Sequence, residues 1–287
     1  MKKSAGIIIP VLLIVACIFA VFYFHSKADD AYSTTKNADT VSTSETSKYQ
    51  SYIDRNSDFV GYIKIDGTDI DYPVVQREDN EFYLTHNFDK KEEERGAIYM
   101  STECNPFSED FNTVLYGHNW LDTTMFSELV KYDDIEFYKQ HPVILFDTAY
   151  EDRQWKIFAV FITNADENED GGYVFNYVYP HLGGDNFNGY ISEVNKRTLY
   201  KTDVDVNSGD KILTLSTCYR GMDTGDYRAD ARIVVVARLV RNGESVNSNT
   251  SKAVKNSNPK YPQRYCDIMG IDNQYSNDEY WYPYENE

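Results

Sequence analysis

Cysteine is scarce in this sequence, with only four among 287 residues. Folds that depend on disulfides usually carry more cysteines, in an even number. Cys17 lies in an apolar N-terminal run, which leaves Cys104, Cys218 and Cys266 for the rest of the chain. Because that number is odd, at least one of them must be a free thiol. Nothing in the sequence supports a bridge between Cys104 and Cys266.

Basic residues are also few. The chain has 28 Lys and Arg against 46 Asp and Glu, a formal net charge of −18. Nucleic acids require a basic face on their partner, so we expect no nucleic-acid partner. The sequence also lacks a metal-ligand cluster with usable spacing, a glycine-rich phosphate loop and a Gly-x-Ser-x-Gly elbow. We therefore expect neither a metal ion nor a cofactor.

Residues 5–24 form an uncharged apolar run preceded by two lysines. About 20 apolar residues are enough to span a bilayer core. The positive-inside rule then predicts a single-pass anchor in the cell membrane, with residues 1–4 cytoplasmic and the domain that follows the anchor extracellular. A cleaved signal peptide and a lipoprotein with Cys17 in its lipobox are the alternatives. Both are disfavoured because the run is long and continues past Cys17.

The rest of the chain divides by composition. Residues 25–48 are polar and rich in Ser and Thr, which predicts a linker. Short segments rich in Val, Ile, Tyr and Phe fill residues 49–240 and predict strands. The eight candidate strands lie at 59–65, 69–76, 96–100, 112–118, 143–146, 154–163, 211–217 and 232–240. We therefore expect a mainly β (α+β) fold, a closed barrel or a sandwich.

Three segments have the residue pattern of helices: 47–58, 123–132 and 186–200. The first is a short helical segment ahead of the first strand. Residues 241–287 are first polar and then acidic and aromatic. We interpret them as a mostly mobile C-terminal extension.

Cys218 ends the apolar stretch "ILTLST". Taken alone, it is better explained as a small buried residue at a strand end than as a nucleophile. A cysteine nucleophile also needs a proton shuttle and donors for the developing oxyanion. Among the five histidines, only His118 ends a strong strand and enters a glycine-containing turn.

Arg232 is the candidate donor. If the strands 211–217 and 232–240 pair as antiparallel neighbours, Arg232 lies at the same sheet end as Cys218. A guanidinium there could bind a carbonyl oxygen or stabilise a thiolate. Arg220 and Arg228, in the connecting loop, are rivals for this role.

Three motifs together resemble those of the sortases, the cysteine transpeptidases of Gram-positive bacteria. They are TLSTC at 214–218, YGH at 116–118 and RIVVV at 232–236. The long insertion at 164–210 and the helix ahead of the first strand are similar to class B sortases in particular. The resemblance covers about residues 49–240.

This resemblance implies a closed eight-stranded β-barrel, with a helix-containing insertion before the cysteine strand. It implies that Cys218 is the nucleophile, His118 the general acid/base and Arg232 the group that positions the substrate or binds the oxyanion. The substrate would be a surface protein with a C-terminal sorting signal similar to Asn-Pro-x-Thr-x, cleaved after threonine. Substrate-binding residues implied by motif position are Ser216, Thr217, Asn80, Leu84, Tyr173 and Val174.

The amine that accepts the acyl group remains open. The resemblance implies the peptidoglycan precursor lipid II, and a pilin lysine, as in a pilin polymerase, is the alternative. An L,D-transpeptidase is a different class, but that family has glycine before its cysteine, where this chain has Thr217. A non-catalytic wall-binding module with a buried Cys218 is the remaining alternative.

Overall fold

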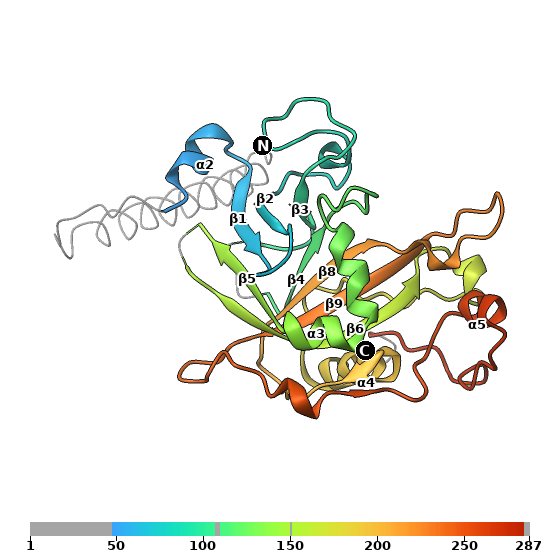
Figure 1. Cartoon of the computed structure of the whole chain (residues 1–287). Helices are drawn as coiled ribbons and strands as arrows, with labels where there is room; N and C mark the ends of the chain where they lie inside the picture. The colour runs from blue at the N-terminus through green and yellow to red at the C-terminus, as the bar shows by residue number, and fades with distance from the viewer. Residues whose placement is uncertain (1–47, 107–109, 150, 284–287) are drawn as a thin grey trace, which may run out of the picture. The chain divides into compact units, whose positions relative to one another are not determined.

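Eight strands form one closed barrel in this computed structural model, which describes residues 48–106, 110–149 and 151–283 (Figure 1). The strands are β1 Phe59–Lys64, β2 Asp71–Val75, β3 Ile98–Met100, β4 Asn112–Tyr116, β5 Val143–Thr148, β6 Gln154–Asn164, β8 Ile212–Cys218 and β9 Ala231–Leu239. Around the barrel they follow the order β1-β2-β3-β4-β8-β9-β6-β5. Each predicted strand segment overlaps one of them, so the predicted closed eight-stranded barrel is confirmed.

Short elements connect the strands. The helices are α2 Gln50–Arg55, α3 Ile135–Gln140, α4 Gly184–Arg197 and α5 Gln263–Met269. The 3₁₀ turns are η1 Phe82–Leu84, η2 Ser127–Asp133, η3 Glu167–Glu169, η4 Arg220–Met222 and η5 Thr250–Lys252, and a small sheet pairs β7 Tyr200–Lys201 with β10 Val254–Lys255. The helix predicted at 123–132 is instead the 3₁₀ turn η2. A new helix starts after it because the Asp134 carboxylate caps α3 by accepting the Glu136 N–H.

Strand β9 separates two apolar cores. Ile233, Val235 and Ala237 point into the barrel, as the alternation of side chains along a strand requires. Val234 and Val236 point to the other face, where they join a second core with residues of α4 and of the insertion. The α4 side chains in this core are Tyr190 and Val194, which share one face of the helix. The insertion is therefore part of the packed structure.

The C-terminal extension docks on the barrel and the insertion, whereas the sequence predicts a mobile segment. Trp281 packs into the second core, and the ring of Tyr280 stacks on that of Tyr173 with centroids 4.4 Å apart. Gly189 on α4 makes room for this contact. A Cβ there would lie 2.4 Å from the indole nitrogen of Trp281, so only glycine fits. The aromatic residues of the extension thus bury apolar area on the domain.

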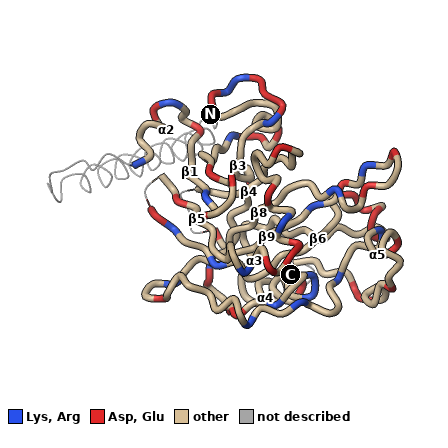
Figure 2. The backbone as a smooth tube through the Cα atoms, viewed as in Figure 1, with Lys and Arg blue, Asp and Glu red and all other residues tan. Residues whose placement is uncertain are grey.

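Charged residues lie mostly in the loops, as Figure 2 shows, and Arg238 on β9 is an exception because it is fully buried. Its guanidinium forms two hydrogen bonds with the carboxylate of Glu244, at 2.7 and 2.8 Å. Lys156 donates to the same carboxylate at 2.7 Å. The bonds from Arg238 and Lys156 outweigh partial burial and hold the pKa of Glu244 well below its usual range. The first residues of the extension therefore neutralise a buried barrel arginine.

The predicted location at the cell membrane must be corrected. Within the three described stretches, no helix is both long enough and apolar enough to cross a bilayer. The apolar run at 5–24, the cytoplasmic segment 1–4 and most of the linker 25–48 lie outside the described residues. The transmembrane assignment rests on the hydropathy of residues 5–24 and on the two lysines before them, and it has no support in the described residues.

We predict that Glu244→Ala lowers the free energy of unfolding by about 2–3 kcal/mol. The substitution removes two charge-assisted hydrogen bonds of the buried Arg238 and leaves only the longer of its ion pairs, with Asp205 at 3.8 Å. The lowered pKa of Glu244 means that its charge, and hence its contribution, is fully present at neutral pH and is lost on acidification. Urea unfolding at pH 7 measures the difference. The matched control is Glu78→Ala, whose side chain is 86% exposed and should change stability little. Equal stabilities of the two variants would contradict the prediction.

Candidate active site

Cys218 and Arg232 face each other across the last pair of the β8–β9 ladder. Strand β8 ends at Cys218, and β9 begins one residue before Arg232. The predicted antiparallel pairing is therefore confirmed, and it fixes both residues at one end of the barrel. Cys218 is exposed, as a nucleophile that must meet a protein substrate requires.

His118 reaches the same end of the barrel from the other side of β8. Strands β4 and β8 are parallel neighbours, with Tyr116 paired to Ser216. His118 and Cys218 each follow that pair by two residues. The hydroxyl of Thr217 donates to the carbonyl of Gly117 at 2.7 Å and continues the contact beyond the ladder. Three strand ends thus bring together the three residues that the sequence singles out.

Close packing explains the glycine before the histidine. A Cβ on Gly117 would lie 2.4 Å from Ile98 and 2.9 Å from the ring of Phe126. Only glycine allows the chain to turn between these two core residues. The turn carries His118 out of β4 toward the barrel end.

The ring of His118 is held by a backbone contact. Its Nε2 lies 2.9 Å from the carbonyl oxygen of Leu84. A carbonyl oxygen can only accept, so Nε2 carries a proton and donates it to this bond. Trp120 packs edge-on against the imidazole, with centroids 5.9 Å apart. The histidine therefore has a defined orientation before any substrate binds.

Arg232 is mostly buried, and its guanidinium is held by neighbouring residues of its own strand end. Its side chain is 24% exposed and forms an ion pair with Asp230, and it also donates to the Ala231 carbonyl at 3.0 Å. Burial lowers the pKa of Arg232, but electrostatic interactions with Cys218, Tyr177 and Asp230 raise it overall. A guanidinium opposite Cys218 in the ladder can stabilise negative charge on its sulfur.

Two residues at this site were missed by sequence reasoning. The hydroxyl of Tyr177 bonds to the Ser216 hydroxyl at 2.8 Å, beneath the Cys218–Arg232 pair. The side chain of Asn119 donates to the carbonyl of Cys218 at 2.8 Å. Asn119 could have been found from the sequence, because it directly follows His118. Tyr177 gave no such signal, because it lies in an irregular part of the insertion without hydrophobic periodicity.

The six residues named for substrate binding lie in different places. Ser216 and Thr217 are buried below the site, with their hydroxyls engaged by Tyr177 and Gly117. Leu84 borders His118 through its carbonyl, and the side chain of Asn80 accepts the N–H of Thr102 at 2.9 Å. Tyr173 lies in the second core, covered by the C-terminal extension, and the half-buried Val174 follows it.

Comparisons with known proteins agree with this geometry. Residues 63–240 match the family described as "Sortase domain". The chain belongs to the sortase family. The protein named Sortase B of Listeria monocytogenes is 34% identical over 185 residues, which are 64% of this chain and 71% of that protein. Sortase B of Staphylococcus aureus is 33% identical over 187 residues, 65% of this chain and 72% of that one.

Solved structures place this sortase in class B. The structure titled "X-ray Structure of Clostridium Perfringens Sortase B" superposes with a TM-score of 0.60 at 33% identity, over 68% of this chain and all of that one. The Staphylococcus aureus sortase B–substrate complex gives a TM-score of 0.59 at 32% identity, over 67% and 84%. The chain is therefore a cysteine transpeptidase of the sortase B type, and the L,D-transpeptidase and wall-binding alternatives are set aside.

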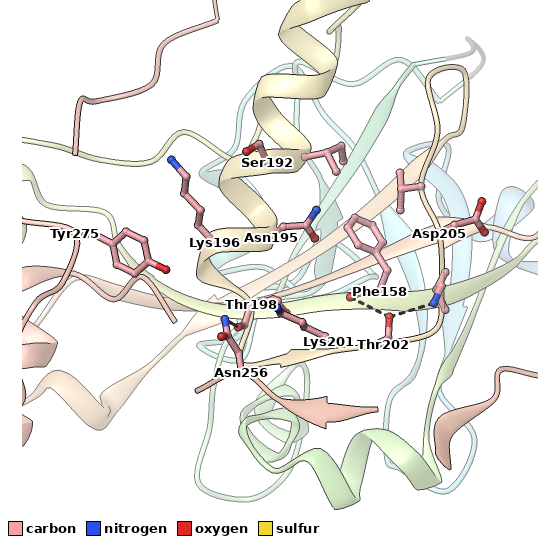
Figure 3. Close-up of a pocket in the computed structure, with 13 residues that line it drawn as sticks. Phe158, Ser192, Asn195, Lys196, Thr198, Lys201, Thr202, Asp205, Asn256 and Tyr275 are labelled. Carbon is pink, nitrogen blue, oxygen red and sulfur yellow. Dashed lines mark hydrogen bonds between the residues drawn. The ribbon is translucent and has the colours of Figure 1, made fainter. Parts of the chain in front are cut away.

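A separate pocket of this sortase lies away from the three candidate catalytic residues. This pocket, of about 620 Å³, lies between α4, β7 and the C-terminal extension, with polar groups such as Lys196, Lys201 and Asn256 along its walls (Figure 3). None of the three candidate catalytic residues lines it. Throughout the described parts of the chain, no group of three or more His, Cys, Asp or Glu could hold a metal ion.

We predict that Cys218 is alkylated at least about tenfold faster than Cys104 or Cys266 in the native protein at pH 7. Both other thiols are buried, and burial raises the pKa of Cys104 to about 11 and also raises that of Cys266. Brief treatment with iodoacetamide followed by peptide mass mapping measures the three rates. The same treatment in urea should remove the difference, whereas equally fast labelling of native Cys104 would refute it.

Proposed function

We propose that this sortase cleaves a C-terminal sorting signal similar to Asn-Pro-x-Thr-x after its threonine, and joins the new carboxyl end to an amine of lipid II. The observation that carries the proposal is the Cys218–Arg232 pair with His118 at the adjoining strand end. Membership of the sortase family supports the reaction type. The substrate complex of the Staphylococcus aureus relative supports binding of a substrate by this fold.

The first half of the reaction forms a thioester. The Cys218 thiolate attacks the carbonyl carbon of threonine, and the negative charge moves to the carbonyl oxygen. Arg232 lies next to Cys218 in the ladder, so its N–H groups can donate to that oxygen. When the C–N bond breaks, protonated His118 gives a proton to the leaving amine. The acyl group remains on the cysteine sulfur.

The second half reverses these roles. An amine attacks the thioester carbonyl, and His118 takes the proton that the new amide nitrogen must lose. The C–S bond then breaks and returns the electron pair to sulfur as thiolate. A new amide bond replaces the one that was cleaved, so no cofactor or energy source is needed.

We propose that the segment 80–84 lines one side of the substrate groove. The carbonyl of Leu84 accepts a hydrogen bond from His118. The side chain of Asn80 accepts the backbone N–H of Thr102, just after β3. Ser216 and Thr217 form the floor of this groove, and the hydrogen bonds of their hydroxyls to Tyr177 and to the Gly117 carbonyl hold that floor in place. We assign no substrate contact to Tyr173, because its ring already stacks on that of Tyr280 and its hydroxyl donates to the carbonyl of Trp281.

We expect Cys218→Ala to reduce cleavage of a fluorogenic sorting-signal peptide at least about a thousandfold, because the substitution removes the nucleophile. Cys218 is exposed, so the melting temperature should stay close to that of the parent. Cys104→Ala is the control, because it removes a thiol remote from the three strand ends and should retain turnover. Cleavage by Cys218→Ala at the parental rate would exclude the proposed mechanism.

Arg232→Lys should lower kcat/KM about 100-fold, because lysine keeps the charge but lacks the planar fork of donors. The rate is measured with the same peptide, and KM should change less than kcat. Arg228→Lys is the matched control, with an exposed side chain in the loop after Cys218. A normal rate for Arg232→Lys with a slow Arg228→Lys would transfer the role to Arg228.

A further inference from the structure

The loop that joins Cys218 to Arg232, residues 219–230, has little support of its own. Most of its residues are exposed, and Met222 is the buried exception. Its internal bonds are a reciprocal pair between the backbones of Thr224 and Tyr227, at 3.1 and 2.9 Å, and a bond from the Ala229 N–H to the Asp223 carboxylate at 3.0 Å, together with a few short turns. Segments with few buried contacts open easily, so contacts from outside decide the conformation of such a loop.

Arg264 on α5 supplies the first outside contact. Its Nε donates to the carbonyl of Met222 at 3.2 Å, and its Nη2 donates to the hydroxyl of Thr224 at 2.8 Å. The guanidinium also lies over the ring of Tyr227, 3.9 Å from the centroid. One side chain thus binds both the outgoing and the returning arm of the loop. Figure 1 shows α5 on the side of the molecule where the loop after β8 lies.

Glu169 supplies the second contact, from the insertion. This buried carboxylate accepts the hydroxyl of Tyr227 at 2.9 Å and the backbone N–H of Asp230 at 3.0 Å. Asp230 in turn holds Arg232 through their ion pair. A continuous path of contacts therefore leads from Arg264 through Tyr227 and Glu169 to the end of the loop and to Arg232.

Helix α5 is itself fixed in place. The N–H of Gln263 donates to the carboxylate of Asp170 at 2.9 Å, and Cys266 is buried. Tyr261 and Tyr265 stack with centroids 4.1 Å apart. Both rings line a cavity of about 240 Å³ together with Tyr219, the residue after Cys218. Arg264 therefore extends from an anchored support.

We propose that Arg264 is a positioning residue of this sortase, which clamps the loop 219–230 and thereby holds Arg232 in the orientation that the reaction needs. The proposal rests on the proposed function, because it assigns Arg264 to that same site. A guanidinium that is already aligned need not be ordered when the oxyanion forms. Loosening the loop should therefore slow the chemical step more than it weakens substrate binding.

The test compares Arg264→Ala, Arg264→Lys and Arg241→Ala in the full chain. Arg241 is the matched control: it pairs with Asp210 and Asp205 at the other end of β9, away from the loop. Sorting-signal peptide cleavage gives kcat and KM per active thiol, with active thiols counted by alkylation of Cys218. Hydrogen exchange of residues 219–230 reports on the clamp without any substrate.

We expect Arg264→Ala to lower kcat about tenfold with little change in KM, and to speed amide exchange in the loop. Arg264→Lys should fall between it and the parent, because lysine keeps the charge over Tyr227 but loses the paired donors. Arg241→Ala should match the parent in kcat and in loop exchange. A merely structural role would lower the count of active thiols and leave kcat per thiol unchanged.

Two outcomes would overturn the inference. Unchanged loop exchange in Arg264→Ala would show that there is no clamp, whether or not any peptide is cleaved. Faster loop exchange with parental kcat would show a clamp without a role in positioning. Failure of the parent protein to cleave sorting-signal peptides would instead refute the proposed function, and the exchange comparison would still decide whether Arg264 holds the loop.

Discussion

The position of β8 between β4 and β9 is the constraint on which the rest of this sortase depends. Its parallel pairing with β4 and its antiparallel pairing with β9 make one barrel end the meeting point of three strand ends. Cys218 ends the central strand, His118 follows one neighbour and Arg232 begins the other. A cysteine transpeptidase needs a nucleophile, a proton carrier and an oxyanion donor within reach of one carbonyl group. Backbone pairing alone brings these three chemical types together.

This arrangement needs a rigid β9, and its two buried faces provide that rigidity. The strand packs into the barrel on one side and into the second core on the other. The second core also holds Tyr177, which supports the hydroxyl of Ser216 under the Cys218–Arg232 pair. The insertion thus does two things: its apolar residues cover β9, and one of them, Tyr177, also bonds to Ser216 next to the candidate active site.

Much of this could be predicted from the sequence, because the information was local. Alternation along β8 and β9 and their short connection placed Cys218 opposite Arg232, and a glycine turn marked His118. The parallel pairing of β4 with β8 was not accessible in this way, because nearly a hundred residues separate the two strands. The role of Tyr177 was equally hidden, since it depends on the folded path of an irregular insertion. The contacts of Tyr173 were hidden for a related reason, because its partners lie in the C-terminal extension.

The extension shows why a family match does not describe the whole working unit. The match ends at residue 240, yet the carboxylate that neutralises the buried Arg238 is that of Glu244. The β8–β9 ladder ends close to Cys218 and Arg232, where the N–H of Tyr219 donates to the carbonyl of Ala231. Beyond that bond the sheet can no longer hold the loop, and Glu169 and Arg264 are the side chains that do. The three proposed catalytic residues therefore lie in the family core, whereas one of the side chains that hold their loop, Arg264, lies outside the matched region.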